Sequence, residues 1–374
     1  EAFVESNVDN KQHRPAPDVR HPIHKYTFHA RLWPFRRGNR IRTRLARLGL
    51  PVLVAQLVGH IRRFKPDCLF AIYARPHWIL ATWLASRITG VPLVYHIHDA
   101  FLEQSERLKR SAYYPWLEKK TLTTSRVLAL DEHMAEHYER RYGIKCTILR
   151  HIVRRPPMPA RRSRDRQGAP ADREMLIGFA GAIYDSNSRE LAELCRIVND
   201  DPKLRLRVRT GSRPHELERL GIDGPHVEAG FAPDYDRLLE DLAECDLLYL
   251  PLHFSAGATA AAGAMELSLP TKIFDYLLTG VPILAHCPES FALSAFFRRH
   301  PCAYVLNETG ADAVKQWLAR WRSGSLPPLD DALRLRTLAM YSADQNKRTL
   351  MQVVTEEVEN AAARKQRRIG SSTS

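Results

Sequence analysis

The segment Thr89–His96 recurs 190 positions later as Thr279–His286, with the shared pattern Thr-Gly-Val-Pro, an apolar run and His. Each copy follows an apolar helical pattern. Gly just past a helix can adopt the left-handed conformation that ends it, and Pro then stops the helix from continuing. Val-Pro before aliphatic residues is typical of the start of a buried parallel strand. The repeat therefore predicts two α/β domains built alike, with chance as the alternative because short motifs often recur.

Length and composition fit this organisation. The chain has 374 residues, of which 44% are hydrophobic and 26% charged, as in ordinary globular proteins with domains of about 150–200 residues. No apolar run approaches the roughly 18–20 residues that span a bilayer. The six cysteines have neither paired nor metal-site spacing. We therefore expect reduced core thiols in a cytoplasmic protein, and no metal site.

A net charge of +14 leaves several partners open. Nucleic acid, an anionic membrane surface and phosphorylated substrates all attract basic proteins, and an arginine-rich composition without function is a further explanation. The segment His29–Arg44 combines Trp33 and Phe35 with six arginines. It fits a patch that contacts the inner face of the cell membrane or nucleic acid, or else a solvated basic loop. The chain begins with Glu1, so we expect an incomplete N-terminus.

Strands and helices are expected to alternate, which predicts parallel sheets with helices on both faces. We divide the chain into a Rossmann-like domain at 1–152, a Pro- and Arg-rich linker at 153–173, a second such domain at 174–330, and a final helix with a polar tail at 331–374. The fold class is therefore α/β, with two Rossmann-like domains facing a cleft. Expected strands are 68–73, 91–97, 126–130, 147–152, 175–180, 204–210, 227–231, 247–252, 281–286 and 303–306.

Ligands of such sheets bind beyond the carboxyl ends of the strands. In the second half, Pro270–Tyr276 opens the helix before the second Gly-Val-Pro. Lys272 in a first helical turn opposes the helix dipole, and a bound diphosphate would resolve the conflict. The alternative is a surface ion pair between Lys272 and Asp275, three residues on. Asp275 is also suited to ribose hydroxyls. The remaining candidates for ligand binding in this half are Thr271, Gly181 and the pair Gly230-Phe231.

In the first half, His96, His98 and Asp99 end a predicted strand. Alternation places His96 and His98 on the same side of it. A His–Asp pair at a strand end can orient an acceptor hydroxyl or support developing charge, with satisfied structural histidines as the alternative. Asp131 follows the next strand and is expected at the same edge.

Taken in order, these motifs resemble those of glycosyltransferase family 4, of the two-Rossmann-domain GT-B type. The resemblance extends from about Lys65 to Leu306. It rests on Lys65-Pro66-Asp67, on Thr89–Asp99 and above all on Pro270-x-Lys272-x-x-Asp275-Tyr276-x-x-x-Gly280-x-Pro282.

The resemblance implies retaining, metal-independent transfer of a sugar, expected to be a hexose, from a UDP- or GDP-sugar that serves as substrate, with no cofactor. It implies a glycan or lipid-linked acceptor in envelope polysaccharide synthesis. Asp275 would hold the ribose, Lys272 the diphosphate, and His98 would lie near the transferred sugar or the acceptor. The expected catalytic residues are His98, Asp99 and Lys272. The last helix would return to the first domain.

Several departures from the family pattern stand out. Asp275 replaces the usual Glu, and Gly181–Asp185 lacks the usual Arg and Lys. Arg150-His151 replaces Asn-Gly at the expected hinge. No counterpart of the family's first strand and Gly-rich loop precedes residue 40, as in a fragment or a diverged member. A sugar-nucleotide epimerase or hydrolase of the same fold, and a nonspecific nucleic-acid-binding protein, are the alternative functions.

Overall fold

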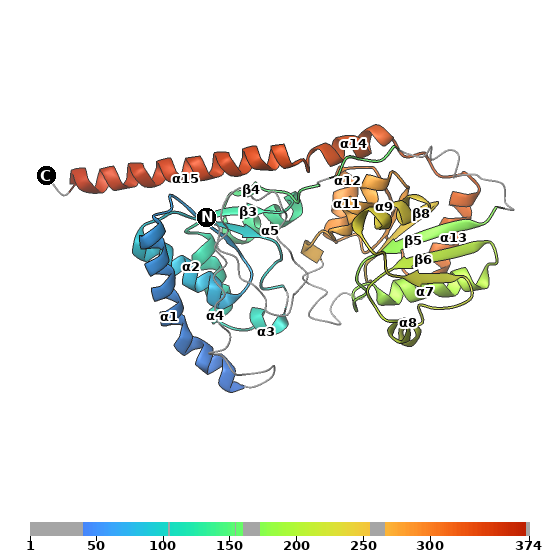
Figure 1. Ribbon diagram of the computed structural model, residues 1–374, viewed down its shortest axis with the longest axis horizontal. Helices are drawn as coiled ribbons and strands as arrows, with labels where there is room; N and C mark the ends of the chain where they lie inside the picture. Colours follow the sequence, from blue (N-terminus) through green and yellow to red (C-terminus); the bar gives the residue numbers. More distant parts are fainter. Residues whose placement is uncertain (1–39, 104, 154, 160–172, 255–265, 372–374) are drawn as a thin grey trace. The chain divides into compact units, whose positions relative to one another are not determined.

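The computed structural model describes residues 40–103, 105–153, 155–159, 173–254 and 266–371 (Figure 1). The chain divides into two compact units, residues 1–53 and 54–374. Helix α1 (Arg40–Phe64) runs across this boundary. Both β-sheets belong to the second unit.

The first sheet has four parallel strands in the order β1-β2-β3-β4. Its last strand is shorter than the predicted 147–152, because the Arg150 N–H donates to Asn346 Oδ1 (2.8 Å) instead of to a neighbouring strand. The strands are β1 (Leu69–Ile72), β2 (Leu93–Ile97), β3 (Arg126–Ala129) and β4 (Cys146–Ile148), and they are connected by α2 (Pro76–Thr89), α3 (Glu106–Lys109), α4 (Tyr113–Leu122) and α5 (Glu132–Tyr142).

The second sheet has six parallel strands in the order β10-β9-β8-β5-β6-β7. The chain winds outward from β5 in one direction and from β8 in the other. The point between these two strands is where such a sheet binds ligands at its carboxyl edge. The strands are β5 (Met175–Ala180), β6 (Leu204–Arg209), β7 (Val227–Gly230), β8 (Leu247–Pro251), β9 (Ile283–His286) and β10 (Tyr304–Leu306).

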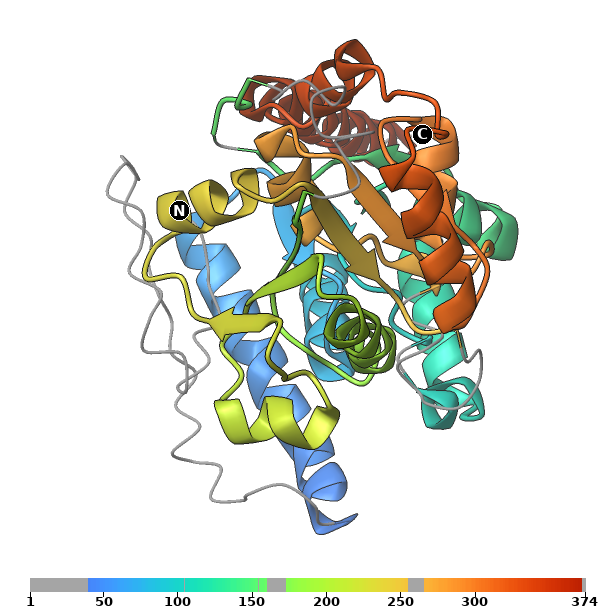
Figure 2. The ribbon, with the colours of Figure 1, turned by 90° about the vertical axis from the view of Figure 1, so that its right-hand side faces the viewer.

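Helices cover both faces of the second sheet, as Figures 1 and 2 show. Apolar side chains of alternating strand residues bury against one helical layer or the other, which is the pattern expected of a doubly wound sheet. One layer contains α7 (Ser188–Asp200), α8 (Pro214–Leu220) and α13 (Ala311–Arg322). The other contains α9 (Tyr235–Ala243), α11 (Lys272–Thr279), α12 (Ala292–Arg299) and α14 (Asp331–Ala339).

The two Thr-Gly-Val-Pro segments form equivalent joints, one in each sheet. Gly90 ends α2 with φ +75°, and Gly280 ends α11 with φ +67°, both in the left-handed conformation. Each glycine leads within three residues into a buried strand, β2 or β9. The prediction of two parallel α/β sheets built on the same joint is therefore confirmed.

The last helix, α15 (Ala343–Ser371), packs on the first sheet. Val353 lies in one apolar cluster with Val94 of β2 and Leu128 of β3. Arg126 of β3 and Glu356 form an ion pair at 3.1 Å.

All six cysteines are free, and five of them are buried. Among the described helices, none has the length and apolar character needed to cross a bilayer.

Candidate active site

Lys272 is the first residue of α11 and lies where β5 ends. One turn later, the Tyr276 hydroxyl accepts a hydrogen bond from the Ala180 N–H (2.8 Å) and lies 3.4 Å from the Tyr249 carbonyl oxygen. This tyrosine therefore ties α11 to both β5 and β8. As a result, the N-terminus of α11 is fixed at the point where the strand order reverses.

The ammonium group of Lys272 is buried and has no hydrogen-bond partner among the described residues. It lies 4.3 Å from the ring centroid of Phe179, in a cation–π contact. Burial alone lowers the pKa of Lys272 from 10.5 to about 8, with no compensating anion. The alternative prediction of a Lys272–Asp275 ion pair is wrong, since the carboxylate of Asp275 is hydrogen-bonded to Tyr235 instead. A buried cation of this kind, at the positive end of a helix dipole, is suited to an anionic ligand.

Gly181 provides the space that Lys272 occupies. Its φ of +119° is a conformation that side chains disfavour, and a Cβ atom would lie 3.3 Å from both Cε and Nζ of Lys272. Its N–H donates to the Arg209 carbonyl oxygen (2.9 Å), which fixes the backbone. The lysine side chain therefore lies against the backbone of Gly181, and a role of Gly181 in ligand binding stays a prediction.

Asp275 is held by a residue that the sequence analysis did not single out. The hydroxyl of Tyr235, the first residue of α9, donates to Asp275 Oδ1 at 2.7 Å. Burial raises the pKa of Asp275, and this hydrogen bond opposes the rise. The signal in the sequence was Asp234, an N-cap residue, which places the next residue at the start of a helix. Within the described part of the chain, Oδ2 of this carboxylate has no hydrogen bond, so it can accept one from a ligand.

The other residues predicted for the donor site, at the carboxyl edge of the second sheet, make fewer contacts. Gly230 is not required sterically, because a Cβ there would meet its nearest neighbour, Arg209 Nη1, at 3.6 Å. Phe231 follows β7 with 75% of its surface exposed, so its ring is available for stacking. Thr271 immediately precedes α11, is exposed and makes no side-chain cap.

On the first sheet, His96 and His98 touch, which confirms that they share a side of the strand. His98 Nε2 lies 3.0 Å from His96 Nδ1, and His96 Nε2 lies 3.0 Å from the carbonyl oxygen of Leu149. A carbonyl only accepts, so His96 Nε2 carries the proton and its Nδ1 accepts one from His98 Nε2. In the neutral state, His98 therefore presents an unprotonated Nδ1.

Burial is also the main reason why both histidines are neutral near pH 7. It lowers the pKa of His96 to about 4, helped by the neighbouring His98, and it lowers the pKa of His98 as well. His151, whose pKa is lowered mainly by burial, makes ring contacts with His98 at 6.1 Å and with Phe274 of α11 at 5.9 Å. His98 is thus a hydrogen-bond acceptor beside a second neutral imidazole.

The two acidic residues predicted here differ in environment. Asp99 is exposed, next to His98. Asp131 is buried and caps α5, its Oδ1 accepting from the Met134 N–H at 2.9 Å. Burial raises the pKa of Asp131 to about 6. Its second oxygen has no partner among the described residues, so a role beyond capping stays a prediction.

Within the described ranges, no three His, Cys, Asp or Glu side chains are grouped so that they could hold a metal ion.

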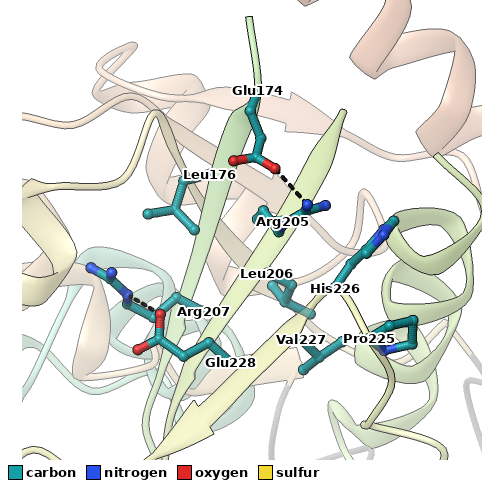
Figure 3. Close-up of a pocket in the computed structure, with 9 residues that line it drawn as sticks. All are labelled: Glu174, Leu176, Arg205, Leu206, Arg207, Pro225, His226, Val227 and Glu228. Carbon is teal, nitrogen blue, oxygen red and sulfur yellow. Dashed lines mark hydrogen bonds and ion pairs between the residues drawn. The ribbon is translucent and has the colours of Figure 1, made fainter. Parts of the chain in front are cut away.

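A groove of about 330 Å³ lies at the opposite, amino edge of β5, β6 and β7 (Figure 3). Its arginines are already neutralised: Arg205 pairs with Glu174 at 2.7 Å, and Arg207 with Glu228 at 3.2 Å. None of the predicted site residues lines it. Charge and topology therefore favour the carboxyl edge with Lys272 as the ligand site.

Residues 10–148, a little over a third of the chain, match the model of the glycosyl transferase 4-like domain. No curated protein matches the sequence.

Several solved structures have the same fold at low sequence identity. Sucrose-phosphate synthase from Thermosynechococcus elongatus is 15% identical, with 95% of this chain and 88% of that one covered and a TM-score of 0.61. The apo form of the lipopolysaccharide outer core galactosyltransferase WaaB is 13% identical, with 84% and 82% covered and a TM-score of 0.58. HepE from Anabaena, in complex with UDP, is 13% identical, with 81% and 82% covered and a TM-score of 0.57.

Proposed function

We propose that this chain, whose fold is that of GT-B glycosyltransferases and whose residues 10–148 match the glycosyl transferase 4-like domain, transfers a hexose from a UDP- or GDP-sugar to a hydroxyl acceptor. The acceptor is a glycan or its lipid-linked precursor in envelope polysaccharide synthesis, and transfer retains the anomeric configuration without a metal or cofactor. The observation that carries the proposal is the buried, unpaired ammonium of Lys272 at the N-terminus of α11. Similar structures were solved with UDP and with UDP-glucose, which supports a nucleotide-sugar donor.

The described side chains supply the groups that such a transfer requires. Lys272 and the first N–H groups of α11 stabilise the diphosphate as negative charge builds up on the leaving group. Asp275, held by Tyr235, accepts from ribose hydroxyls, and the exposed ring of Phe231 stacks on the base. On the acceptor side, the unprotonated Nδ1 of His98 accepts a hydrogen bond from a sugar or acceptor hydroxyl. Lys272 also takes over the role of the basic residues missing from Gly181–Asp185.

A thermal-shift panel of UDP, GDP and ADP tests the donor site. One of the first two nucleotides should stabilise the protein, and Lys272→Ala should lose that shift. Preorganised charge of this kind contributes about 3–4 kcal/mol to the transition state, so the variant should turn over roughly 10²-fold more slowly or worse. Lys315→Ala, an exposed lysine on α13, is the matched control. Near-normal turnover in Lys272→Ala would contradict the assignment.

Analysis of the reaction products, together with the nucleotide panel, separates the other reaction classes. Release of free sugar without an acceptor, or isomerisation of the donor, would indicate a hydrolase or an epimerase. Binding to any duplex with a steep salt dependence, without a nucleotide shift, would indicate nonspecific nucleic-acid binding.

We place the enzyme in the cytoplasm, peripherally on the inner face of the membrane. The side chains of the predicted segment His29–Arg44 lie outside the described part of the chain, so α4 carries this proposal. Its exposed face has Tyr113 and Trp116, with 39% and 53% of their surfaces exposed, followed by Lys119 and Lys120. Aromatic rings beside lysines are typical of a headgroup-level contact. Tyr114 of α4 contacts the ring of Phe101, which follows β2, with the ring centroids 6.1 Å apart, so the aromatic half of α4 lies near the carboxyl end of β2.

Vesicle sedimentation measures this contact. Trp116→Ala and the double variant Lys119→Glu/Lys120→Glu should each weaken binding to vesicles with anionic lipid, whereas neutral vesicles should bind poorly throughout. Met351→Ala on α15 and Lys315→Glu/Arg320→Glu on α13 are matched exposed controls. Equal binding to acidic and neutral vesicles would count against the contact.

A further inference from the structure

An ionisable pair, His253 with Glu190, lies at the carboxyl end of β8, the strand next to β5 in the sheet. His253 is the second residue after this strand, and its N–H donates to the Ser186 carbonyl oxygen (2.8 Å) in the loop that follows β5. β5 and β8 are neighbours in the sheet. The hydroxyl of Tyr276 contacts the backbone of both, one helical turn from Lys272. His253 and Lys272 therefore border the same point of the sheet, where the strand order reverses.

His253 is oriented by a buried carboxylate. Glu190, in the first turn of α7 and only 3% exposed, accepts from His253 Nδ1 at 2.9 Å and from the Phe254 N–H at 3.2 Å through the same oxygen, Oε1. Because a carboxylate only accepts, Nδ1 carries the proton. The other ring nitrogen, Nε2, has no hydrogen bond within the described part of the chain, and the side chain keeps 20% of its surface exposed. Nε2 is therefore open to a ligand.

The neighbouring ionisable groups do not compete for this role. His286 of β9 uses both ring nitrogens, one with the Tyr249 hydroxyl at 2.6 Å and one with the Glu308 carbonyl oxygen at 2.8 Å. Glu193 of α7 faces Arg189 at 3.7 Å and Arg196 at 4.0 Å. Among the described groups around His253, Glu190 is the one that contacts its ring directly.

A diphosphate diester carries two negative charges, and Lys272 supplies one positive charge. The loop Gly181–Asp185 supplies none. We propose that His253 is the second cationic contact of the donor diphosphate, protonated at Nε2 when the ligand binds, and that Glu190 is its positioning residue. This inference rests on the proposed nucleotide-sugar donor and adds to it a residue outside the family's motif.

Calorimetry at pH 7 tests it, with UDP-glucose and GDP-glucose as probes in two buffers of different ionisation enthalpy. Neither probe has a phosphate group that titrates near pH 7. With a pKa of about 8, Lys272 is already about nine-tenths protonated there and takes up only about a tenth of a proton. Wild-type protein should take up a clearly larger fraction on binding. His253→Gln should lose this uptake and bind about tenfold or more weakly, the loss expected for a hydrogen bond to a charged group.

Two further variants keep the test independent of folding. Glu190→Gln should reduce both uptake and affinity while leaving the imidazole in place. His226→Gln, a histidine at the amino edge of the same sheet that bonds the Val198 carbonyl oxygen at 2.9 Å, is the matched control and should bind as wild type. If proton uptake persists in His253→Gln, or if His226→Gln loses as much uptake and affinity, the inference about His253 is overturned while the proposed function stands. If neither probe binds the wild-type protein, the proposed function itself fails.

Discussion

Replacing Lys272 with methionine tests whether this ammonium is buried for a ligand at the expense of stability. Met keeps the length and apolar character of the stem without the charge. Burial lowers the pKa of Lys272 from 10.5 to about 8, and at about 1.36 kcal/mol per pKa unit the charged form costs the folded protein roughly 3 kcal/mol. The cation–π contact with Phe179 offsets about 0.5–2 kcal/mol of this cost. The ligand-free variant should therefore be about 1–3 kcal/mol more stable at pH 7.

The gain should depend on pH in a defined direction. Because folding depresses the pKa of Lys272, the unfolded chain binds more protons than the folded protein between pH 8 and pH 10.5. Wild-type protein therefore gains stability as the pH rises through this window, and the advantage of Lys272→Met should fade over the same range.

Urea unfolding at both ends of the window measures the difference, with Lys315→Met as control, expected within about 0.5 kcal/mol of wild type. The nucleotide-induced thermal shift should disappear in Lys272→Met and persist in the control. A variant no more stable than wild type at pH 7, or an advantage that does not change with pH, would refute the reasoning.

Three other substitutions probe single contacts. Gly181→Ala places a Cβ 3.3 Å from the Lys272 side chain at φ +119°, so it should lose about 1–3 kcal/mol of stability and weaken donor binding in calorimetry, whereas Gly230→Ala should change neither. Tyr235→Phe removes the 2.7 Å hydrogen bond to Asp275 and should weaken UDP or GDP binding by roughly tenfold; unchanged affinity would remove Tyr235 from the site. Burial raises the pKa of Glu118 to about 7 from 4.5, so wild-type stability should fall between pH 4.5 and pH 7, and Glu118→Gln should flatten that fall of up to roughly 3 kcal/mol in urea unfolding.

The two sheets could be predicted because their signals are local. Gly90 and Gly280 each end a helix and Pro follows within two residues, so the joint can be identified without any long-range contact. The short helices α8 and α14 were not predicted. Each buries only one apolar side chain, Leu217 in α8 and Leu338 in α14, so neither shows a clear apolar period. Strand β4 ended early for a long-range reason, the bond from Arg150 to Asn346, almost two hundred positions away.

The site residues were predictable by type more than by environment. A lysine in a first helical turn indicates an anion from sequence alone. Its burial against Phe179 and Gly181, about ninety positions upstream, depends on how β5 and α11 pack. The same holds for Tyr235 with Asp275 and for Glu190 with His253, which are brought together from 40 and 63 positions apart.

Burial leaves the ionisable groups at the carboxyl edges of the two sheets in different charge states. On the first sheet it lowers the pKa of His96 and His98, so both imidazoles are neutral at pH 7 and His98 offers a lone pair. On the second sheet, burial lowers the pKa of Lys272 only to about 8. This group therefore stays mostly cationic at pH 7, although it has no hydrogen-bond partner among the described residues. A neutral acceptor on one side and an uncompensated cation on the other suit the two substrates of a sugar transfer: a hydroxyl, and a diphosphate whose charge grows as it leaves. Above pH 8 the cation is lost while the histidines do not change, so donor affinity should fall with pH before any effect on the acceptor appears.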